Sequence, residues 1–334
     1  MRRAIDLARR GIGNVSPNPL VGAVIVHNGS ILGEGFHKEY GGQHAEVNAI
    51  HKVEKKELLA ESTMYVTLEP CSHHGKTPPC ADLLVEHSFK RVVIGMKDPN
   101  PLVAGRGIQR LIDAGIEVTL DVEADQIRSM NRPFIVNQLK NRPYILLKWA
   151  QTADGFIART DYSSKWISGA ESRTLVHKWR AESDAILVGA NTVRHDDPAL
   201  TVRDWTGNDP VRIVIDREHS LDESYKLFQS APLTLSYTRK YRADNEHTQW
   251  LSLGDNMGWK QILADLYKRG IGILMVEGGA QILDSLIKDG YWDEARIFVS
   301  DITFGEGISA PELPLHCLDE KIDLPDTLFR YINK

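Results

Sequence analysis

The stretch 63–84, TMYVTLEPCSHHGKTPPCADLL, decides the fold of the first half of this chain. Its opening residues, TMYVTLEP, are rich in strand-forming side chains and end at Pro70, which predicts a short strand. The segment that begins at Cys80, CADLLVEHS, predicts a helix. The strand therefore leads into a helix through a connection that carries two cysteines, Cys71 and Cys80, with eight residues between them.

The flanking segments extend the same alternation of strands and helices. Residues 20–37, LVGAVIVHNGSILGEGFH, predict two strands around an Asn28-Gly29 turn, and residues 44–53, HAEVNAIHKV, predict a helix. Residues 91–99, RVVIGMKDP, predict a strand, and residues 107–120 predict a helix, a stop at Gly115 and a further strand. This order indicates an α/β layer fold with a mostly parallel sheet, complete by about residue 122.

A polar helical stretch, 123–140, precedes Asn141-Arg142-Pro143, which breaks the pattern and predicts the boundary between domains 1–142 and 143–334. The second half repeats the alternation and predicts a second α/β domain. Its expected strands are YILLKWA, AILVGA, VRIVID, APLTLSY, GILMVEGG and ARIFVSDITF, and its expected helices are SRTLVHKWRAES and AQILDSLIKDG. Residues 189–203, GANTVRHDDPALTVR, are expected in a loop after a strand, and residues 221–257 in an edge strand with long loops.

The composition is that of an ordinary soluble globular protein. The chain has 334 residues, which predicts two domains, and hydrophobic residues make up 42% of it. The net charge of −5 and the absence of a long cationic cluster argue against nucleic-acid binding. No run of 18 apolar residues or signal peptide is visible, and three cysteines indicate a reducing compartment, so we expect a cytoplasmic protein without membrane contact.

One imidazole and two thiolates in the first half predict a zinc site with an open fourth position, which is the catalytic type. The expected ligands are His44, Cys71 and Cys80, with His44 and Cys71 both expected at helix N-termini, where the dipole favours thiolate. Glu46 lies two residues after His44, so it flanks the metal without ligating it and can move protons. A histidine on a helix is more often simply packed, and isolated cysteines are usually buried hydrophobes. Rival ligands are His51, His73 and His74.

These groups suit deamination of a pyrimidine by zinc-activated hydroxide. The usual zinc deaminase signature is His-x-Glu followed by Pro-Cys-x-x-Cys, whereas here the insert SHHGKTPP separates the cysteines. In the second half no Gly-x-Gly-x-x-Gly is present. Val276-Glu277-Gly278-Gly279 instead joins a strand to a helix, which is either a phosphate-binding turn or only a tight turn. These loops at strand ends predict a small-molecule pocket.

The chain resembles the bifunctional riboflavin-biosynthesis deaminase–reductase family. The resemblance rests on SPNPLVGAVIV, GEGFHKEYGGQHAE, HAEVNAI, YVTLEPCSHHGKTPPCADLL and KDPNPLVAGRGIQRLIDAGIEV, and on residues 142–307. It implies a cytidine-deaminase-like three-layer domain followed by a dihydrofolate-reductase-like domain, with zinc and NADPH as cofactors. The implied substrate is diaminohydroxyphosphoribosylaminopyrimidine, whose ribosyl group becomes ribityl after reduction.

The resemblance also implies the binding residues. In the deaminase half these are Asn18 and His37 in the pocket and Lys76 facing the substrate phosphate, with Glu46 as the proton shuttle. The residues implied to contact NADPH are Ala150, Trp166, Thr192, Asp196, Gly279, Ala280, Gln281, Ile282, Leu283, Asp284 and Ser285. The residues implied to contact the sugar phosphate are Ser164, Arg180, Leu200, Arg203 and Glu277. Lys148 either polarises the reacting sugar carbon or is a packed lysine whose amine reaches toward solvent.

Two departures from the family pattern are visible. Ala23 stands where the family often has cysteine, and residues 304–334, including Cys317, carry no recognisable motif. We expect a homo-oligomer whose partners are small phosphorylated pyrimidines. The alternatives are a tRNA or other nucleic-acid deaminase with an accessory domain, and a non-catalytic regulatory protein that zinc stabilises. Arg217 is a candidate contact for the extra phosphate of NADPH.

Overall fold

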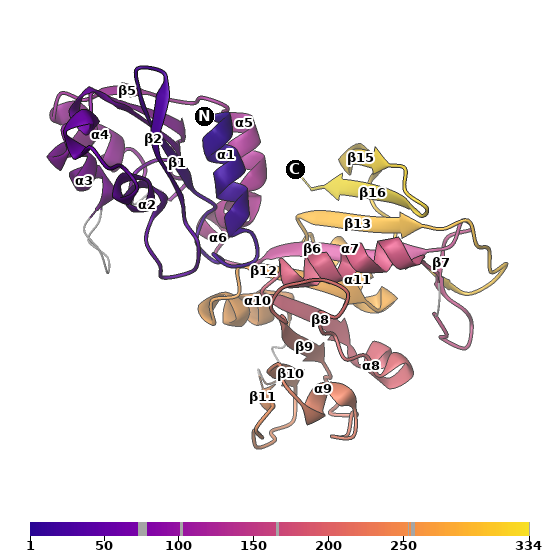
Figure 1. The fold of residues 1–334 in the computed structure, drawn as a ribbon. Coiled ribbons are helices and arrows are strands. Elements are labelled where there is room, and N and C mark those ends of the chain that lie inside the picture. The colour runs from indigo at the N-terminus through magenta and orange to yellow at the C-terminus, as the bar shows by residue number, and fades with distance from the viewer. Residues whose placement is uncertain (73–78, 101–102, 165–166, 253, 255–257, 334) are drawn as a thin grey trace. The chain divides into compact units, whose positions relative to one another are not determined.

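The computed structural model describes residues 1–72, 79–100, 103–164, 167–252, 254 and 258–333. The chain forms two compact units, Met1–Asn141 and Arg142–Lys334 (Figure 1). The division falls within the Asn141-Arg142-Pro143 segment that interrupts the sequence pattern. No helix in the described part of the chain is both long and apolar enough to cross a membrane.

The first unit contains a five-stranded sheet in the order β2-β1-β3-β4-β5 within the described residues. Strands β2, β1 and β3 are antiparallel, and β3, β4 and β5 are parallel. Asn28 and Gly29 both have positive φ, so the expected hairpin turn is confirmed. The strands are β1 (Gly22–His27), β2 (Ser30–Phe36), β3 (Thr63–Leu68), β4 (Arg91–Met96) and β5 (Glu117–Thr119).

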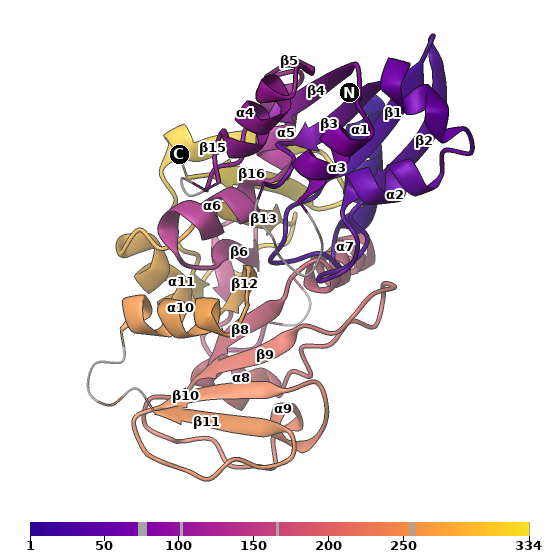
Figure 2. The same cartoon turned by 90° about the vertical axis from the view of Figure 1, so that its left-hand side faces the viewer.

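Helices cover both faces of this sheet. One apolar cluster joins the sheet to α2, α3 and α4, and another joins it to α1, α5 and α6. The expected three-layer fold is therefore confirmed (Figure 2). The helices are α1 (Arg2–Ala8), α2 (Ala45–His51), α3 (Cys80–Glu86), α4 (Arg106–Asp113), α5 (Ala124–Met130) and α6 (Arg132–Lys140), with 3-10 turns at Arg9–Gly11 and Lys56–Glu61.

The expectation that this unit is complete near residue 122 is wrong. Ile127 in α5 is fully buried, and Phe134 and Ile135 in α6 pack in the same cluster as Ile5 of α1. The apolar face of this polar-looking stretch covers the sheet and would otherwise be exposed to water. Residues 124–140 are thus the last layer of the first unit.

Glycine allows α2 to lie close to β2. A Cβ at Gly35 would lie 2.4 Å from the Ala45 carbonyl oxygen and from the Ala49 backbone nitrogen. Such distances are far below van der Waals contact, so a larger residue at this position would displace the helix. This packing fixes His44, which precedes α2, and Glu46 within its first turn.

The second unit contains a nine-stranded sheet in the order β11-β10-β9-β8-β12-β6-β13-β16-β15 within the described residues. The pairs from β11 to β13 are parallel, whereas β16 pairs antiparallel with both β13 and β15. The nine strands are β6 (Tyr144–Gln151), β8 (Ala185–Gly189), β9 (Val211–Ile215), β10 (Thr234–Thr238), β11 (Thr248–Ser252), β12 (Ile273–Gly278), β13 (Glu294–Val299), β15 (Leu318–Ile322) and β16 (Thr327–Ile332). Strands β7 (Phe156–Ala158) and β14 (Ile308–Ser309) pair antiparallel in a separate two-stranded sheet.

Alternate residues of β6 face two helical layers. Ile145 and Leu147 pack with α10 and α11, whereas Leu146 packs with α7. Helices α8 and α9 cover β8 on the α7 side, through Ile186 and Val188. The helices are α7 (Ala170–Ala181), α8 (Ala190–Asp196), α9 (Lys226–Gln229), α10 (Trp259–Lys268) and α11 (Ala280–Lys288), with a 3-10 turn at Leu315–Cys317.

Three features of this unit bear on the expectations from sequence. Residues 190–196 form helix α8, so the loop predicted for residues 189–203 is wrong over this part. The expected edge strand in 221–257 is confirmed as β11. The C-terminal segment without a motif supplies β15 and β16, which continue the sheet beyond β13 (Figure 1, yellow).

Candidate functional site

Three side chains from distant segments meet in the first unit. His44 Nδ1 lies 3.3 Å from Cys80 Sγ and 3.5 Å from Cys71 Sγ. The three ligand atoms all lie within 4.8 Å of one another. His44 is the residue before α2 and Cys80 is the first residue of α3. Cys71 does not begin a helix, contrary to expectation, but its sulfur accepts the N–H of Cys80 at 3.3 Å and thus lies at the start of α3.

The cluster fits a zinc ion. A tetrahedral zinc holds nitrogen at about 2.0–2.1 Å and sulfur at about 2.3 Å, so neighbouring ligand atoms lie roughly 3.6 Å apart. The two distances from His44 Nδ1, 3.3 and 3.5 Å, match this separation. His51, a rival ligand in the sequence, is exposed at the end of α2 and does not belong to the cluster. His73, His74 and Lys76 lie outside the described residues.

The two cysteines differ in how readily they lose a proton. The hydrogen bond from Cys80, aided by one with His44, lowers the pKa of Cys71 to about 4. Contact with Cys71 and burial raise the pKa of Cys80. A bound zinc ion would deprotonate both cysteines, because a coordinating thiol is present as the thiolate.

Glu46 lies beside these ligands and is only 3% exposed. Burial, reinforced by the negative charge of Cys71, raises the pKa of Glu46 to about 7. A carboxyl group with such a pKa exchanges protons readily near neutral pH. Its position and pKa suit a proton shuttle that does not ligate the metal.

Asn18 and His37 form a hydrogen-bonded pair in the same unit. His37 Nδ1 lies 3.0 Å from the Gln43 carbonyl oxygen, and this contact requires a proton on Nδ1. His37 Nε2 is then an acceptor for the Asn18 amide nitrogen at 3.0 Å. Burial lowers the pKa of His37, which favours this neutral form. The arrangement orients the Asn18 amide, whose oxygen is the atom that His37 does not use.

Glu69, two residues before Cys71, was not recognised from the sequence. Its buried carboxylate accepts four backbone N–H groups. Oε2 accepts from Asp98 and Gly105 at 3.2 and 2.9 Å, and Oε1 accepts from Gly107 and Ile108 at 2.9 and 3.3 Å. The carboxylate therefore joins the end of β3 to the start of α4. A charged residue at the end of a buried strand was the available signal.

Asn131 was also not recognised. It is 2% exposed, its amide oxygen accepts the Leu20 N–H at 2.8 Å, and its amide nitrogen donates to the Leu20 carbonyl at 3.1 Å. Leu20 follows Asn18 by two residues, so the start of α6 holds the segment that carries Asn18. The two residues are 111 positions apart, and no local pattern connects them.

In the second unit, Lys148, Arg180 and Glu277 lie together. Arg180 binds Glu277 through two hydrogen bonds of 2.6 and 2.8 Å. Burial alone would raise the pKa of Glu277, but the charge and hydrogen bonds of Arg180 outweigh it and hold the pKa at about 2. Lys148 faces both groups, and burial lowers its pKa. The pairing of Val276 with Leu147 between β12 and β6 places Glu277 and Lys148 on neighbouring strands.

The expected cofactor residues gather at the carboxyl ends of β6, β8 and β12, which are adjacent parallel strands. Ala150 lies near the end of β6, Thr192 and Asp196 lie in α8 after β8, and Ser164 Oγ lies 3.5 Å from Asp196 Oδ1. A Cβ at Gly279 would lie 3.2 Å from Thr192 Oγ1, so these two segments are close. Trp166 lies outside the described residues.

The segment 279–285 contributes both surface and core. Gly279 precedes α11, and Ala280, Gln281 and Asp284 are at least partly exposed. Leu283 is fully buried in the core, and Ile282 packs against it. Ser285 accepts the Trp259 indole N–H at 2.8 Å. The side chains of Leu283 and Ser285 thus hold the helix in place.

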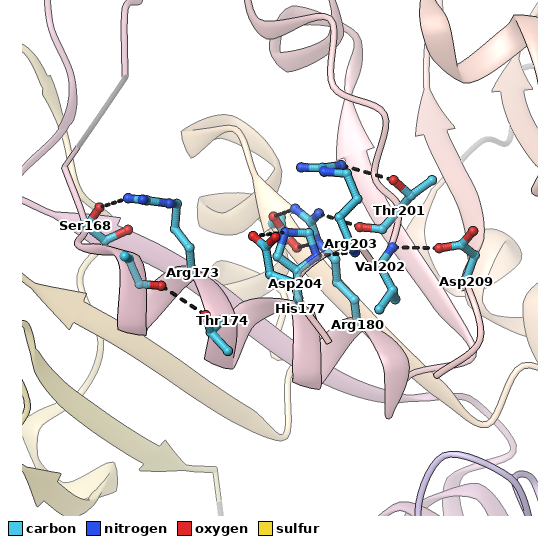
Figure 3. A network of polar contacts seen from close by, with 12 residues as sticks. Ser168, Arg173, Thr174, His177, Arg180, Thr201, Val202, Arg203, Asp204 and Asp209 are labelled. Atoms are coloured by element: carbon cyan, nitrogen blue, oxygen red, sulfur yellow. Dashed lines mark hydrogen bonds and ion pairs between the residues drawn. The ribbon is translucent and has the colours of Figure 1, made fainter. Parts of the chain in front are cut away.

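Arg180 also donates to the Thr201 carbonyl at 3.1 Å, so it contacts the loop that carries Leu200 and Arg203 (Figure 3). Leu200 is buried with a positive φ, and Arg203 is exposed. His177, which was not recognised from the sequence, accepts the Arg203 backbone N–H at 3.1 Å. Three of the five N–H groups of Arg180 donate to Glu277 and to the Thr201 carbonyl.

Comparison with known proteins agrees with this architecture. The family profile of the RibD C-terminal domain matches residues 143–316, and that of the cytidine and deoxycytidylate deaminase zinc-binding region matches residues 1–96. The riboflavin biosynthesis protein RibD of Aquifex aeolicus is 42% identical over 96% of this chain and 92% of its own length. The RibD of Escherichia coli is 36% identical over 99% of this chain and 95% of its own.

The chain belongs to the RibD family. The crystal structure of a diaminohydroxyphosphoribosylaminopyrimidine deaminase/5-amino-6-(5-phosphoribosylamino)uracil reductase from Thermotoga maritima matches with a TM-score of 0.89 and 38% identity, covering 99% of this chain and 97% of that one. RibD from Acinetobacter baumannii matches with a TM-score of 0.89 and 35% identity, with the same coverage.

As a RibD protein, the chain is a bifunctional enzyme of riboflavin biosynthesis with a deaminase part and a reductase part. Zinc is the cofactor of the deaminase part and NADPH that of the reductase part. Neither a nucleic-acid deaminase nor a non-catalytic zinc protein is favoured by these relatives. The expected fold class is confirmed for both parts.

Proposed function

We propose that this chain deaminates diaminohydroxyphosphoribosylaminopyrimidine and then reduces the ribosyl group of the product to ribityl with NADPH. The observation that carries the proposal is the His44, Cys71 and Cys80 cluster with the buried carboxyl of Glu46 beside it. The substrate is the one named for the Thermotoga maritima relative. The residue roles below are part of the same proposal.

In the deaminase, His44, Cys71 and Cys80 hold zinc, which when bound makes water a nucleophile at neutral pH. Glu46 takes one proton from the attacking water and delivers it to the ring nitrogen as the C–O bond forms. It then takes the second proton from the same oxygen and delivers it to the amine, which leaves as ammonia when the C–N bond breaks. The oriented amide of Asn18 and the neutral ring of His37 bind the pyrimidine, because their mutual hydrogen bond fixes which polar atoms they present. Lys76 contacts the substrate phosphate.

In the reductase, the ends of β6, β8 and β12 bind NADPH through Ala150, Trp166, Thr192, Asp196 and residues 279–285. The sugar phosphate contacts Ser164, Arg180, Leu200, Arg203 and Glu277. Lys148 polarises the reacting sugar carbon, which its position beside Glu277 supports. These residues orient substrate and cofactor, and the hydride comes from NADPH.

The remaining proposals concern organisation. Residues 1–142 form the deaminase domain and residues 143–334 the reductase domain, in line with the division between Asn141 and Arg142. The partners are small phosphorylated pyrimidines rather than nucleic acid or membrane, and the net charge of −5 supports this. We also propose a homo-oligomer, and a cytoplasmic location, which three free cysteines support.

The test supplies the diaminopyrimidine phosphate and NADPH to the purified chain and follows ammonia release and NADPH oxidation together. Both are expected, and a chelator should abolish ammonia release. Glu46→Gln should lower ammonia release by at least about a hundredfold while zinc content is unchanged, because general acid–base groups typically contribute 10²–10⁴-fold. Glu54→Gln, at an exposed position, is the matched control. Ammonia release from metal-free protein would refute the mechanism.

A further inference from the structure

Helix α7 presents His177 and Arg180, one turn apart, to the loop that follows α8 (Figure 3). The two side chains bind successive polar groups of that loop with opposite hydrogen-bonding roles. Arg180 Nη1 donates to the Thr201 carbonyl at 3.1 Å, and His177 Nδ1 accepts the Arg203 backbone N–H at 3.1 Å. The loop is thus fixed on both sides of Val202.

The second contact specifies one form of the imidazole. Nδ1 can accept an N–H only if it carries no proton, so the proton of the neutral ring lies on Nε2. The Asp204 carboxylate is 3.5 Å from Nε2, on the side where that proton lies. His177 is 5% exposed, so water cannot easily replace either contact.

We infer that His177 is a positioning residue of the reductase: by accepting the Arg203 N–H on Nδ1, it places the Arg203 guanidinium for the phosphate of the sugar substrate. Arg203 itself is exposed, and its side chain contacts within the described residues include the Thr201 hydroxyl at 3.0 Å. A long exposed arginine is held mainly through its backbone. The inference rests on the proposed function, in which Arg203 binds that phosphate.

Charged groups on three elements face His177. They are Arg180 on its own helix, Arg203 and Asp204 on the loop, and Glu277 on β12. Burial, followed by the charges of Arg180 and Arg203, lowers the pKa of His177 despite the two carboxylates. The neutral ring therefore persists at neutral pH. Protonation at lower pH would turn Nδ1 into a donor and remove the contact with Arg203.

The test compares His177→Asn and His177→Gln in the full chain, with 5-amino-6-(5-phosphoribosylamino)uracil and NADPH. The Asn side-chain oxygen reaches the position of Nδ1, whereas the Gln oxygen reaches that of Nε2. Loss of one such hydrogen bond predicts a KM for the sugar substrate that is roughly tenfold higher in His177→Gln. His177→Asn should restore KM to within about twofold, and the KM for NADPH should stay constant in both variants.

Inorganic phosphate serves as the second probe. Its inhibition constant should rise in His177→Gln in parallel with KM. Thr174→Ala, at a partly exposed position of α7 whose hydroxyl donates to the Ala170 carbonyl of the same helix, is the matched control. In the wild type, the KM for the sugar substrate should rise as pH falls below 6.5, because His177 becomes protonated. His177→Asn cannot be protonated there, so any rise that remains in this variant comes from titration of the substrate phosphate.

Equal KM values for His177→Asn and His177→Gln, or the same pH profile for His177→Asn and wild type, would overturn the inference alone. Failure of the wild type to oxidise NADPH with this substrate would overturn the proposed function and the inference with it. Tryptophan fluorescence during urea unfolding checks that the variants are folded, because all seven tryptophans lie beyond residue 142.

Discussion

Replacing Glu69 by Gln should loosen the deaminase unit and leave the reductase unit unchanged. The carboxylate accepts two N–H groups on each oxygen. An amide retains one accepting oxygen, so two donors lose their acceptor in either orientation of the amide. The N–H groups of Gly107 and Ile108 are buried, whereas those of Asp98 and Gly105 are only partly buried. The amide oxygen should therefore stay with Gly107 and Ile108.

The expected loss of stability follows from the two N–H groups that are left without an acceptor. A buried donor without an acceptor costs about 1–3 kcal/mol, and partial access to water places Asp98 and Gly105 at the lower end, so the expected loss is about 2–4 kcal/mol. This is a large part of the roughly 5–15 kcal/mol that stabilises a typical domain. The zinc site should open with the unit, since Glu69 is two residues from Cys71.

The assay uses the uneven distribution of tryptophan. All seven tryptophans belong to the second unit, so their fluorescence reports its unfolding, while a zinc-sensitive dye reports release of metal from the first. In Glu69→Gln, the free energy of unfolding obtained from the zinc-release curve should fall by about 2–4 kcal/mol, so zinc is released at lower urea concentration. The tryptophan transition should be unchanged. Glu86→Gln, at an exposed position of α3, is the control. A zinc-release shift no larger than that of the control, or an equal shift of both signals, would refute the reasoning.

Two further predictions use the same separation of signals. Asn131→Ala removes both contacts with the Leu20 backbone, so the KM for the diaminopyrimidine substrate, measured by ammonia release, should rise several-fold. NADPH oxidation with the aminouracil substrate should be unchanged. Equal effects on the two activities would contradict a local role of Asn131. Glu277 and Glu294 have pKa values of about 2, below the ordinary 4.5, because neighbouring arginines outweigh burial. Their stabilisation of the reductase unit is complete above pH 4.5 and is lost as pH falls toward 2. The free energy of unfolding obtained from tryptophan fluorescence should therefore fall over that pH range. It should fall less steeply in Glu294→Gln, which lacks one of the two carboxylates.

Much of the fold could be predicted because it depends on local pattern. The Asn28-Gly29 hairpin, the stop at Gly115 and the strand that ends before Pro70 each follow from a few neighbouring residues. The errors lie where local pattern is weak. The seven residues of α8 bury only Val193, which is too little for a visible 3.6-residue repeat. The apolar face of α5 and α6 was obscured by their many polar residues.

For the candidate metal site too, the sequence predicted some features and the structure added others. His44, Cys71 and Cys80 were found because few side chains bind zinc, so their identity and order carry the information by themselves. The role of Glu46 was predicted from its spacing from His44 and stays a prediction. The structure adds that Nδ1 is the atom nearest both sulfurs and that burial raises the pKa of Glu46.

By itself, then, the sequence determined two α/β domains, the zinc ligands and the RibD resemblance. Only the tertiary structure decided that Glu69 caps the start of α4, that Asn131 holds Leu20 and that His177 accepts the Arg203 N–H. Each of these side chains binds a backbone group far away in the chain. Every residue type except proline offers the same backbone N–H, so the partner is chosen by where the chain folds and not by which residue stands there.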